Sequence, residues 1–126
     1  MALQRKDLRP DVTRTVTANG ITIRCARYGD PADPVLLLVM GIGTQLDGWD
    51  MEFCDELVDA GFCVVRFDNR DVGMSQHFAG TPDVAAIRRG DLSSLPYRLD
   101  DMAADAMGLL DALGVERAHV LGASMG

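Results

Sequence analysis

The sequence contains no long apolar run and no apolar N-terminal segment. Its longest aliphatic stretch, Val35 to Met40, is far shorter than the roughly 20 residues that a membrane-spanning helix needs. Charged residues occupy the N-terminus, where a secretory signal peptide would carry its apolar segment. We therefore predict a cytoplasmic protein with no membrane span.

Basic residues are scarce: 12 lysines and arginines stand against 19 acidic residues, which gives a net charge of −7. Sequence-independent binding to nucleic acid requires a basic patch, and the only adjacent basic pairs are Arg5-Lys6 and Arg88-Arg89. We interpret Arg88-Arg89 as part of a solvated loop, and we predict no nucleic-acid partner.

Cysteine is also rare, and Cys25, Cys54 and Cys63 fit neither a disulfide framework nor a C-x-x-C metal site. We expect reduced, mostly buried thiols. The 126 residues, 48% of them hydrophobic, are enough for one core and too few for two ordinary domains. The sequence therefore predicts one domain, or a part of one.

The chain opens with the pattern of an antiparallel hairpin. Residues 1–11 are polar and aperiodic, which predicts a flexible N-terminus. Side chains alternate from Val12, Asn19-Gly20 is a strong two-residue turn signal, and Ile21 to Tyr28 alternates again.

The middle of the chain alternates apolar strands with a helical pattern. Val35 to Met40 and Phe62 to Phe67 are apolar runs, and the first lacks any alternation, as expected for a strand covered on both faces. Between them apolar residues recur at helical spacing, and Gly61 is suited to end that helix. The helical set comprises Trp49, Phe53, Cys54, Leu57 and Val58.

Residues 76–98 show no clear period and indicate a long surface excursion with one short helix around Asp83 to Arg88. An apolar stripe from Leu99 to Leu113 then predicts a helix, and Ala118 to Ala123 predicts the final strand. We assign Met102 and Met107 to the core or the helix surface rather than to a cofactor site.

This order of elements predicts an α/β fold: an antiparallel hairpin followed by parallel strands with flanking helices. In such a sheet the loops at the carboxyl ends of the strands carry the site. Three loops are candidates: Gly41 to Gly48, Asp68 to Ser75, and the segment after the final strand.

That last segment reads Gly122-Ala-Ser124-Met-Gly126, a Gly-x-Ser-x-Gly pattern directly after a strand. The pattern is typical of a sharp turn that exposes one serine hydroxyl, and Gly122 and Gly126 supply small residues where a Cβ would clash.

These motifs together resemble the α/β-hydrolase superfamily, and within it bacterial carboxylesterases and methylesterases of the aclacinomycin methylesterase type. The resemblance rests on Leu36 to Gly43, Trp49, Arg66 to Ser75, Tyr97 to Val115 and Gly122 to Gly126. It implies that residues 12–126 are the N-terminal portion of a single α/β-hydrolase domain, which stops at the nucleophile elbow.

The resemblance also implies roles for individual residues. Ser124 would be the nucleophile, and the backbone N–H groups of Ile42 and Met125 would form the oxyanion hole. Gly41 and Gly43 are possible pocket residues, and for Met40 and Trp49 pocket and core remain equal alternatives. Two positions depart from the family pattern: Met40 replaces a frequent histidine, and Asp71 replaces a frequent glycine.

In the family order the acid and the histidine of the triad follow the serine, so neither is expected within this chain. His119 lies five residues before Ser124 in a strand, about 16 Å away at 3.3 Å per residue, and is expected to be structural. His77 follows the turn of Asp68 to Ser75 and is expected near the pocket mouth. A lone histidine is, however, weak evidence for a catalytic base. Asp68 and Arg70 are interpreted as a turn-fixing ion pair rather than an acid–base pair.

We therefore expect a serine hydrolase that cleaves a small-molecule carboxylic ester through an acyl-enzyme, without metal or cofactor. It would be competent only with the C-terminal remainder of the same protein, and the 126 residues alone would be inactive, with an exposed apolar edge on the last strand. Another Ser-dependent activity, such as a prolyl-type aminopeptidase or perhydrolase, stays open, as does a non-catalytic scaffold that binds a ligand or partner.

Overall fold

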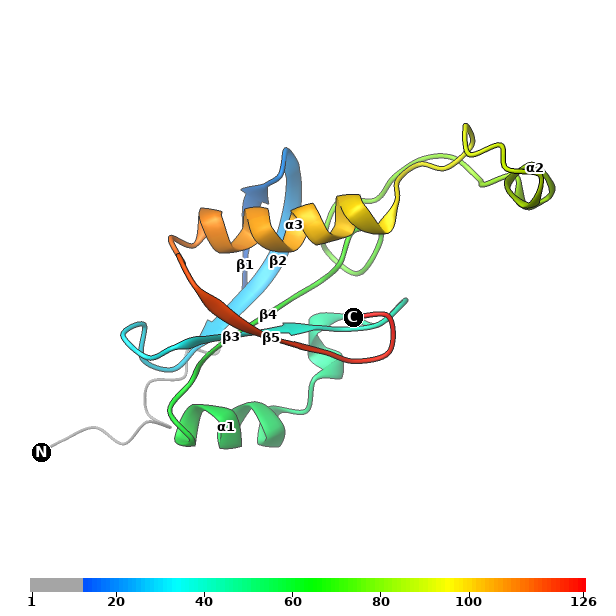
Figure 1. The fold of residues 1–126 in the computed structure, drawn as a ribbon. Helices are drawn as coiled ribbons and strands as arrows, with labels where there is room; N and C mark the ends of the chain where they lie inside the picture. Colours follow the sequence, from blue (N-terminus) through cyan, green and yellow to red (C-terminus); the bar gives the residue numbers. More distant parts are fainter. Residues whose placement is uncertain (1–12) are drawn as a thin grey trace, which may run out of the picture.

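A five-stranded mixed sheet in the order β1-β2-β4-β3-β5 forms the centre of the computed structural model, which describes residues 13–126 (Figure 1). The predicted flexible segment 1–11 and the predicted strand start at Val12 lie outside these residues. The strands are β1 Thr13–Ala18, β2 Ile21–Tyr28, β3 Val35–Val39, β4 Cys63–Phe67 and β5 Ala118–Gly122. The helices are η2 Leu46–Gly48, α1 Met51–Asp59, α2 Val84–Arg88 and α3 Leu99–Ala112.

The hairpin at the start of the sheet is confirmed. Strands β1 and β2 pair antiparallel up to Ala18 and Ile21. Asn19 and Gly20 both have positive φ, 51° and 75°, which the favoured two-residue hairpin turns with matching twist require.

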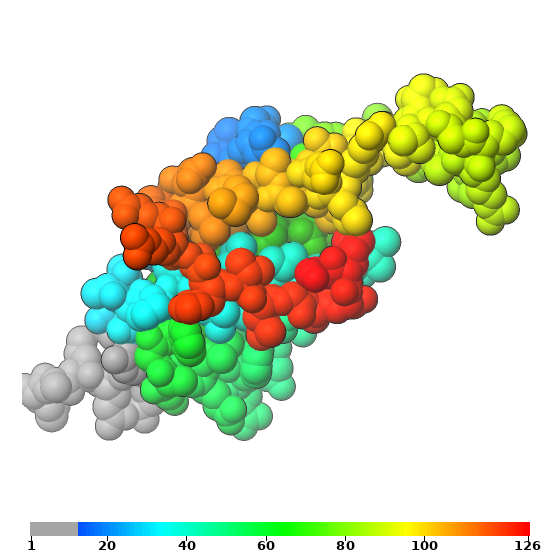
Figure 2. Space-filling model, viewed as in Figure 1, coloured from blue at the N-terminus to red at the C-terminus, as the bar shows by residue number. Residues whose placement is uncertain are grey.

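The remaining strands confirm the predicted mixed sheet. Strand β3 pairs in parallel with β4 on one side and with β5 on the other, and β2 joins β4 antiparallel. The final strand therefore lies beside the first parallel strand, as expected. On β5, Val120 is 63% exposed and Leu121 38%, and Figure 2 shows the strand uncovered on the near face.

Helices α1 and α3 cover opposite faces of the sheet (Figure 1). Cys54 and Val58 of α1 pack on one face, and Leu109 and Leu110 of α3 pack on the other. Each face of the sheet therefore carries its own apolar cluster. Strand β3 contributes to both clusters, which explains why its sequence is apolar without alternation. None of the helices in residues 13–126 is long and apolar enough to cross a membrane.

Two details of the helices differ between the sequence-based prediction and the structure. Trp49 precedes α1 rather than opening it, because Asp50 caps the helix by accepting a hydrogen bond from the Glu52 amide (2.9 Å). Leu99 was assigned to the apolar stripe of α3 but is 64% exposed, since the first turn of α3 borders an open cavity.

The predicted excursion with a short helix is confirmed. Residues 79–96, here called the arm, project away from the sheet and carry α2 (Figures 1 and 2). The arm closes on itself: the Asp83 amide donates to the Ser94 hydroxyl (2.9 Å), and the Asp91 amide donates to the Ala86 carbonyl (2.9 Å).

The predicted ion pair between Asp68 and Arg70 is wrong. Arg70 instead makes a bidentate pair with Asp105 of α3, at 2.6 and 2.8 Å, with side chains only 6% and 2% exposed. The hydrogen bond to Asp105 raises the pKa of Arg70 despite the opposing effect of burial. Asn19 of the hairpin also donates to Asp105 (2.9 Å), so this carboxylate joins three parts of the fold.

Removal of the Asp105 carboxylate should therefore destabilise the protein strongly. We predict that Asp105→Ala lowers the free energy of unfolding by about 3–5 kcal/mol, because it leaves a buried guanidinium without its partner. Urea denaturation measures this loss. Asp111→Ala, which removes an exposed carboxylate from the same helix, should change stability by no more than about 0.5 kcal/mol; equal effects of the two substitutions would contradict the prediction.

Candidate active site

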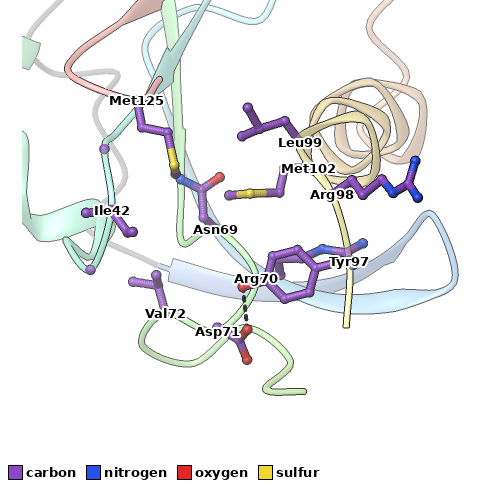
Figure 3. A pocket seen from close by; sticks show the side chains of 12 residues that line it. Ile42, Asn69, Arg70, Asp71, Val72, Tyr97, Arg98, Leu99, Met102 and Met125 are labelled. Carbon is purple, nitrogen blue, oxygen red and sulfur yellow. Dashed lines mark hydrogen bonds between the residues drawn. The ribbon is translucent and has the colours of Figure 1, made fainter. Parts of the chain in front are cut away.

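The three loops at the carboxyl ends of the parallel strands meet around one cavity of about 370 Å³ (Figure 3). The loop after β3, the turn after β4 and the segment after β5 all contribute, together with the start of α3. The cavity is lined by Gly41, Ile42, Gly43, Asn69, Arg70, Asp71, Val72, Tyr97, Arg98, Leu99, Met102 and Met125. The three loops that the sequence named as candidates thus line the same cavity.

A second, more apolar cavity of about 390 Å³ shares Asn69, Leu99, Met102 and Met125 with the first. Met40 and Gly126 also line it, as do several apolar residues of α3 and Val120 of β5. The surroundings of the loops are thus mainly apolar, and several of the side chains that line the second cavity are flexible methionines.

Ser124 has a positive φ of 59°, a conformation that a non-glycine residue rarely adopts. The hydrogen bonding between β5 and β3 ends directly before Ser124, with a bond from the Ala123 amide to the Val39 carbonyl (3.0 Å). The Gly126 amide then donates back to the Ala123 carbonyl (3.0 Å), which closes a tight turn. The serine is therefore presented at a strained turn at the end of a strand.

Three glycines make room for this turn. A Cβ on Gly122 would overlap the Gly126 backbone, and a Cβ on Gly126 would overlap the Val39 carbonyl. A Cβ on Gly41 would lie 2.7 Å from the Cβ and 3.1 Å from the Oγ of Ser124. The loop after β3 thus packs directly against the serine only because residue 41 has no side chain.

The residues next to these glycines flank the serine. Ile42 follows Gly41 in the chain, and Met125 follows Ser124; both line the first cavity. Neither N–H group is used in a hydrogen bond within the described part of the chain.

Side chains at the end of β4 hold the loop after β3 in place. The Asn69 amide group donates to the Met40 carbonyl (2.8 Å), and Asp68 accepts from the Leu46 amide (2.6 Å). Arg66 donates to the carbonyls of Leu46 and Trp49, each at 3.1 Å. The sequence reasoning missed Arg66 and Asn69; their signal was the occurrence of polar residues in and directly after an otherwise apolar strand.

Trp49 lies in the buried cluster beneath α1 and stacks on Phe53, with ring centroids 6.0 Å apart. Met40 packs partly against the same cluster while also lining the second cavity. Of the two residues for which pocket and core were left open, the structure thus places Trp49 in the core and Met40 at its border with a cavity.

Neither histidine is hydrogen-bonded to Ser124 within the described residues. The His119 ring packs edge-on against Phe62, at the other end of the sheet, with centroids 5.9 Å apart. The Nε2 atom of His77 lies 2.9 Å from the Gly73 carbonyl oxygen, in the turn after β4. In residues 13–126, moreover, no cluster of three or more His, Cys, Asp or Glu side chains is placed to hold a metal ion.

All three cysteines are buried and unpaired, as expected. Burial raises the pKa of the Cys25 and Cys54 thiols, so that both are kept neutral. None of the three thiols lines either of the two cavities at the ends of the parallel strands.

The family follows from comparison with known proteins. A family model described as the alpha/beta hydrolase fold matches residues 34–126, which include all three loops and the serine turn. The chain belongs to the alpha/beta hydrolase fold family. As an alpha/beta hydrolase it resembles methylesterases: it is 40% identical over 114 residues to rhodomycin D methylesterase DnrP of Streptomyces peucetius.

Other relatives of this alpha/beta hydrolase carry different names. It is 33% identical over 113 residues to epoxide hydrolase A of Mycobacterium tuberculosis. Among solved structures, epoxide hydrolase A from Mycobacterium thermoresistibile superposes with a TM-score of 0.68 at 31% identity, covering 88% of this chain and 30% of that one. The enol-lactonase from Burkholderia xenovorans LB400 gives 0.70 at 25% identity, covering 89% and 37%.

The methylesterase of Streptomyces peucetius and the epoxide hydrolase of Mycobacterium tuberculosis each match 90% of this alpha/beta hydrolase chain, but the matches cover only 34% and 31% of those relatives. The chain thus spans about a third of the length of the curated relatives it matches. The part of the relatives that this chain matches comprises the hairpin, the first parallel strands and the serine turn.

Two hydrogen-bonded residues on the cavity wall of this alpha/beta hydrolase, Asp71 and Tyr97, have shifted pKa values. The Tyr97 hydroxyl donates to Asp71, whose other oxygen accepts from the Phe78 amide (2.6 Å). Burial opposes the charge of Asp71, but these hydrogen bonds, together with nearby positive charge such as that of Arg70, outweigh burial and lower the pKa of that carboxyl. Burial and the bond to Asp71 together raise the pKa of Tyr97 to about 12.

We predict that Tyr97 makes stability fall at alkaline pH. Because its folded pKa of about 12 exceeds the usual value of 10.0, the stabilisation that Tyr97 contributes is fully present below about pH 10. It decreases as the pH rises through 12, since the unfolded chain loses the phenolic proton first. The phenolate absorbance difference between the wild type and Tyr97→Phe should titrate near 12; Tyr28, present in both, cancels. A midpoint near 10 would contradict the assignment.

Proposed function

We propose that the complete protein is a serine hydrolase that cleaves a small-molecule carboxylic ester through an acyl-enzyme at Ser124. The observation that carries the proposal is the serine at a left-handed turn, packed against Gly41 of the loop after β3. This arrangement fits a nucleophile elbow beside an oxyanion loop. The 40% identity to a rhodomycin D methylesterase supports an ester as the bond that is cleaved.

In the proposed reaction the Ser124 Oγ attacks the ester carbonyl carbon while its proton passes to a general base. The carbonyl oxygen becomes an oxyanion, which accepts hydrogen bonds from the amides of Ile42 and Met125. Collapse of this intermediate breaks the bond to the alcohol oxygen, which leaves with the proton. Water then attacks the acyl-enzyme in the same way and releases the acid.

The base and the acid that orients it are proposed to lie in the C-terminal remainder of the same protein. His119 packs at the far end of the sheet and His77 bonds within its own turn, so neither is suited to take the Ser124 proton. About two thirds of the length of the methylesterase lies outside the matched segment, which leaves room for such a remainder. Its first contact would be the exposed apolar edge of β5.

The decisive experiment treats the complete protein with a fluorophosphonate, which reacts with activated serine hydroxyls. We predict stoichiometric labelling of Ser124, because an elbow serine with a base and an oxyanion hole is strongly nucleophilic. Mass spectrometry of the labelled peptide identifies the site.

Ser124→Ala serves as the control, and it should lose both the label and at least about a thousandfold in ester turnover. The chain of residues 1–126 alone should show neither label nor turnover, since it lacks the base. An unlabelled Ser124 in the complete protein would favour a non-catalytic, ligand-binding scaffold instead. Turnover by residues 1–126 alone would refute the dependence on the remainder.

A second prediction concerns the glycine that contacts the serine. Gly41→Ala should lower kcat/KM by about a hundredfold, because its Cβ would displace Ser124 or the oxyanion loop by a fraction of an ångström or more. Gly48→Ala, in the same loop, is the matched control. Its Cβ meets chiefly the Thr44 side-chain methyl, which can rotate away. Equal losses in the two variants would contradict this role of Gly41.

A further inference from the structure

The arm of residues 79–96 leaves the body after Phe78 and returns at Tyr97, and these two rings contact each other with centroids 5.4 Å apart. The Arg70 guanidinium stacks over both rings, at 4.6 and 4.8 Å from their centroids. Asp71 accepts from the Phe78 amide (2.6 Å) and from the Tyr97 hydroxyl. Arg70, Asp71, Phe78 and Tyr97 therefore form a clasp that closes the base of the arm.

The backbone of Asp71 has a conformation that is uncommon for a residue with a side chain. Its φ of 66° lies in the left-handed region, where glycine is preferred. A glycine would adopt this conformation at lower cost, so the contacts of the carboxylate must offset the difference. Those contacts reach Phe78 and Tyr97, at opposite ends of the arm.

The clasp also forms part of the cavity wall. Arg70, Asp71 and Tyr97 line the first cavity, and Tyr97 directly precedes Arg98 and Leu99 at the start of α3. Figure 3 shows Ile42 and Met125 on one side of this cavity, and Tyr97, Leu99 and Met102 on the other. The hydrogen bond from Tyr97 to Asp71 thus fixes the wall that faces the serine loop.

We propose that Asp71 is a positioning residue for substrate selection. By holding Tyr97, it sets the width of a cavity that receives a bulky apolar part of the ester. Methionine and leucine side chains on the same wall suit an aromatic body, since sulfur makes favourable contacts with rings. The substrate role of this inference rests on the proposed ester hydrolysis at Ser124; the binding role does not.

The test compares Asp71→Gly with Asp71→Asn in the complete protein. The glycine variant removes both acceptor oxygens and fits the left-handed backbone, so its effects arise from the lost contacts and not from strain. The asparagine variant also tolerates this backbone and keeps one acceptor oxygen. The probe is naphthalene-2-carboxamide, which has no ester bond to cleave, and its fluorescence reports binding directly.

We expect Asp71→Gly to weaken binding of the probe about tenfold and Asp71→Asn to restore most of the affinity. With p-nitrophenyl esters, the ratio of kcat/KM for the 2-naphthoate to that for the acetate should fall about tenfold in the glycine variant. A purely structural role would lower the melting temperature and leave both the affinity and this ratio unchanged, which would overturn the proposal.

Failure of the hydrolase proposal can be distinguished from failure of the role proposed for Asp71. If the wild type binds the carboxamide but is neither labelled at Ser124 nor active on either ester, the hydrolase proposal fails. The binding role of Asp71 is then decided by the affinities alone: a tenfold loss in Asp71→Gly supports it, and equal affinities refute it.

Discussion

The buried carboxylate of Asp68 is the interaction on which the arrangement of the loops depends. It accepts hydrogen bonds from the Leu46 amide (2.6 Å), the Met74 amide (3.0 Å) and Arg24 (3.3 Å). These donors come from the loop after β3, the turn after β4 and the second strand of the hairpin. A buried amide that loses its acceptor costs about 1–3 kcal/mol, so one side chain keeps all three segments in register.

The neighbours of Asp68 extend the same principle along the chain. Arg66 and Asn69 bind carbonyl groups of the loop that packs on the serine, while Arg70 binds α3 and Asp71 binds the base of the arm. Residues in and directly after one strand thus bind different segments that surround the cavity. The geometry around Ser124 therefore depends on β4, a strand that does not itself carry this serine.

Much of this fold could be predicted because its signals are local. Asn19-Gly20 specifies its turn through two adjacent residues, and Gly122 and Gly126 specify a tight turn within five. The partners of Asp68 and Arg70 could not be predicted in this way. Apart from the nearby Met74 amide, their carboxylate and guanidinium bind groups more than 20 residues away in sequence, and several partners of equal charge were available. The exposure of Leu99 was missed for a related reason: the stripe of a helix does not reveal where the sheet beneath it ends.

The arm has a consequence for how this part of the protein can vary. Its two ends are joined by the clasp, and its interior is closed by its own hydrogen bonds, such as that between Asp83 and Ser94. The ends would remain in place if the segment between them were shorter or longer, and each doubling of loop length costs only about 0.6 kcal/mol of closure entropy. The region is thus a site where insertions can accumulate during evolution without disturbing the sheet, directly beside the cavity that faces the serine.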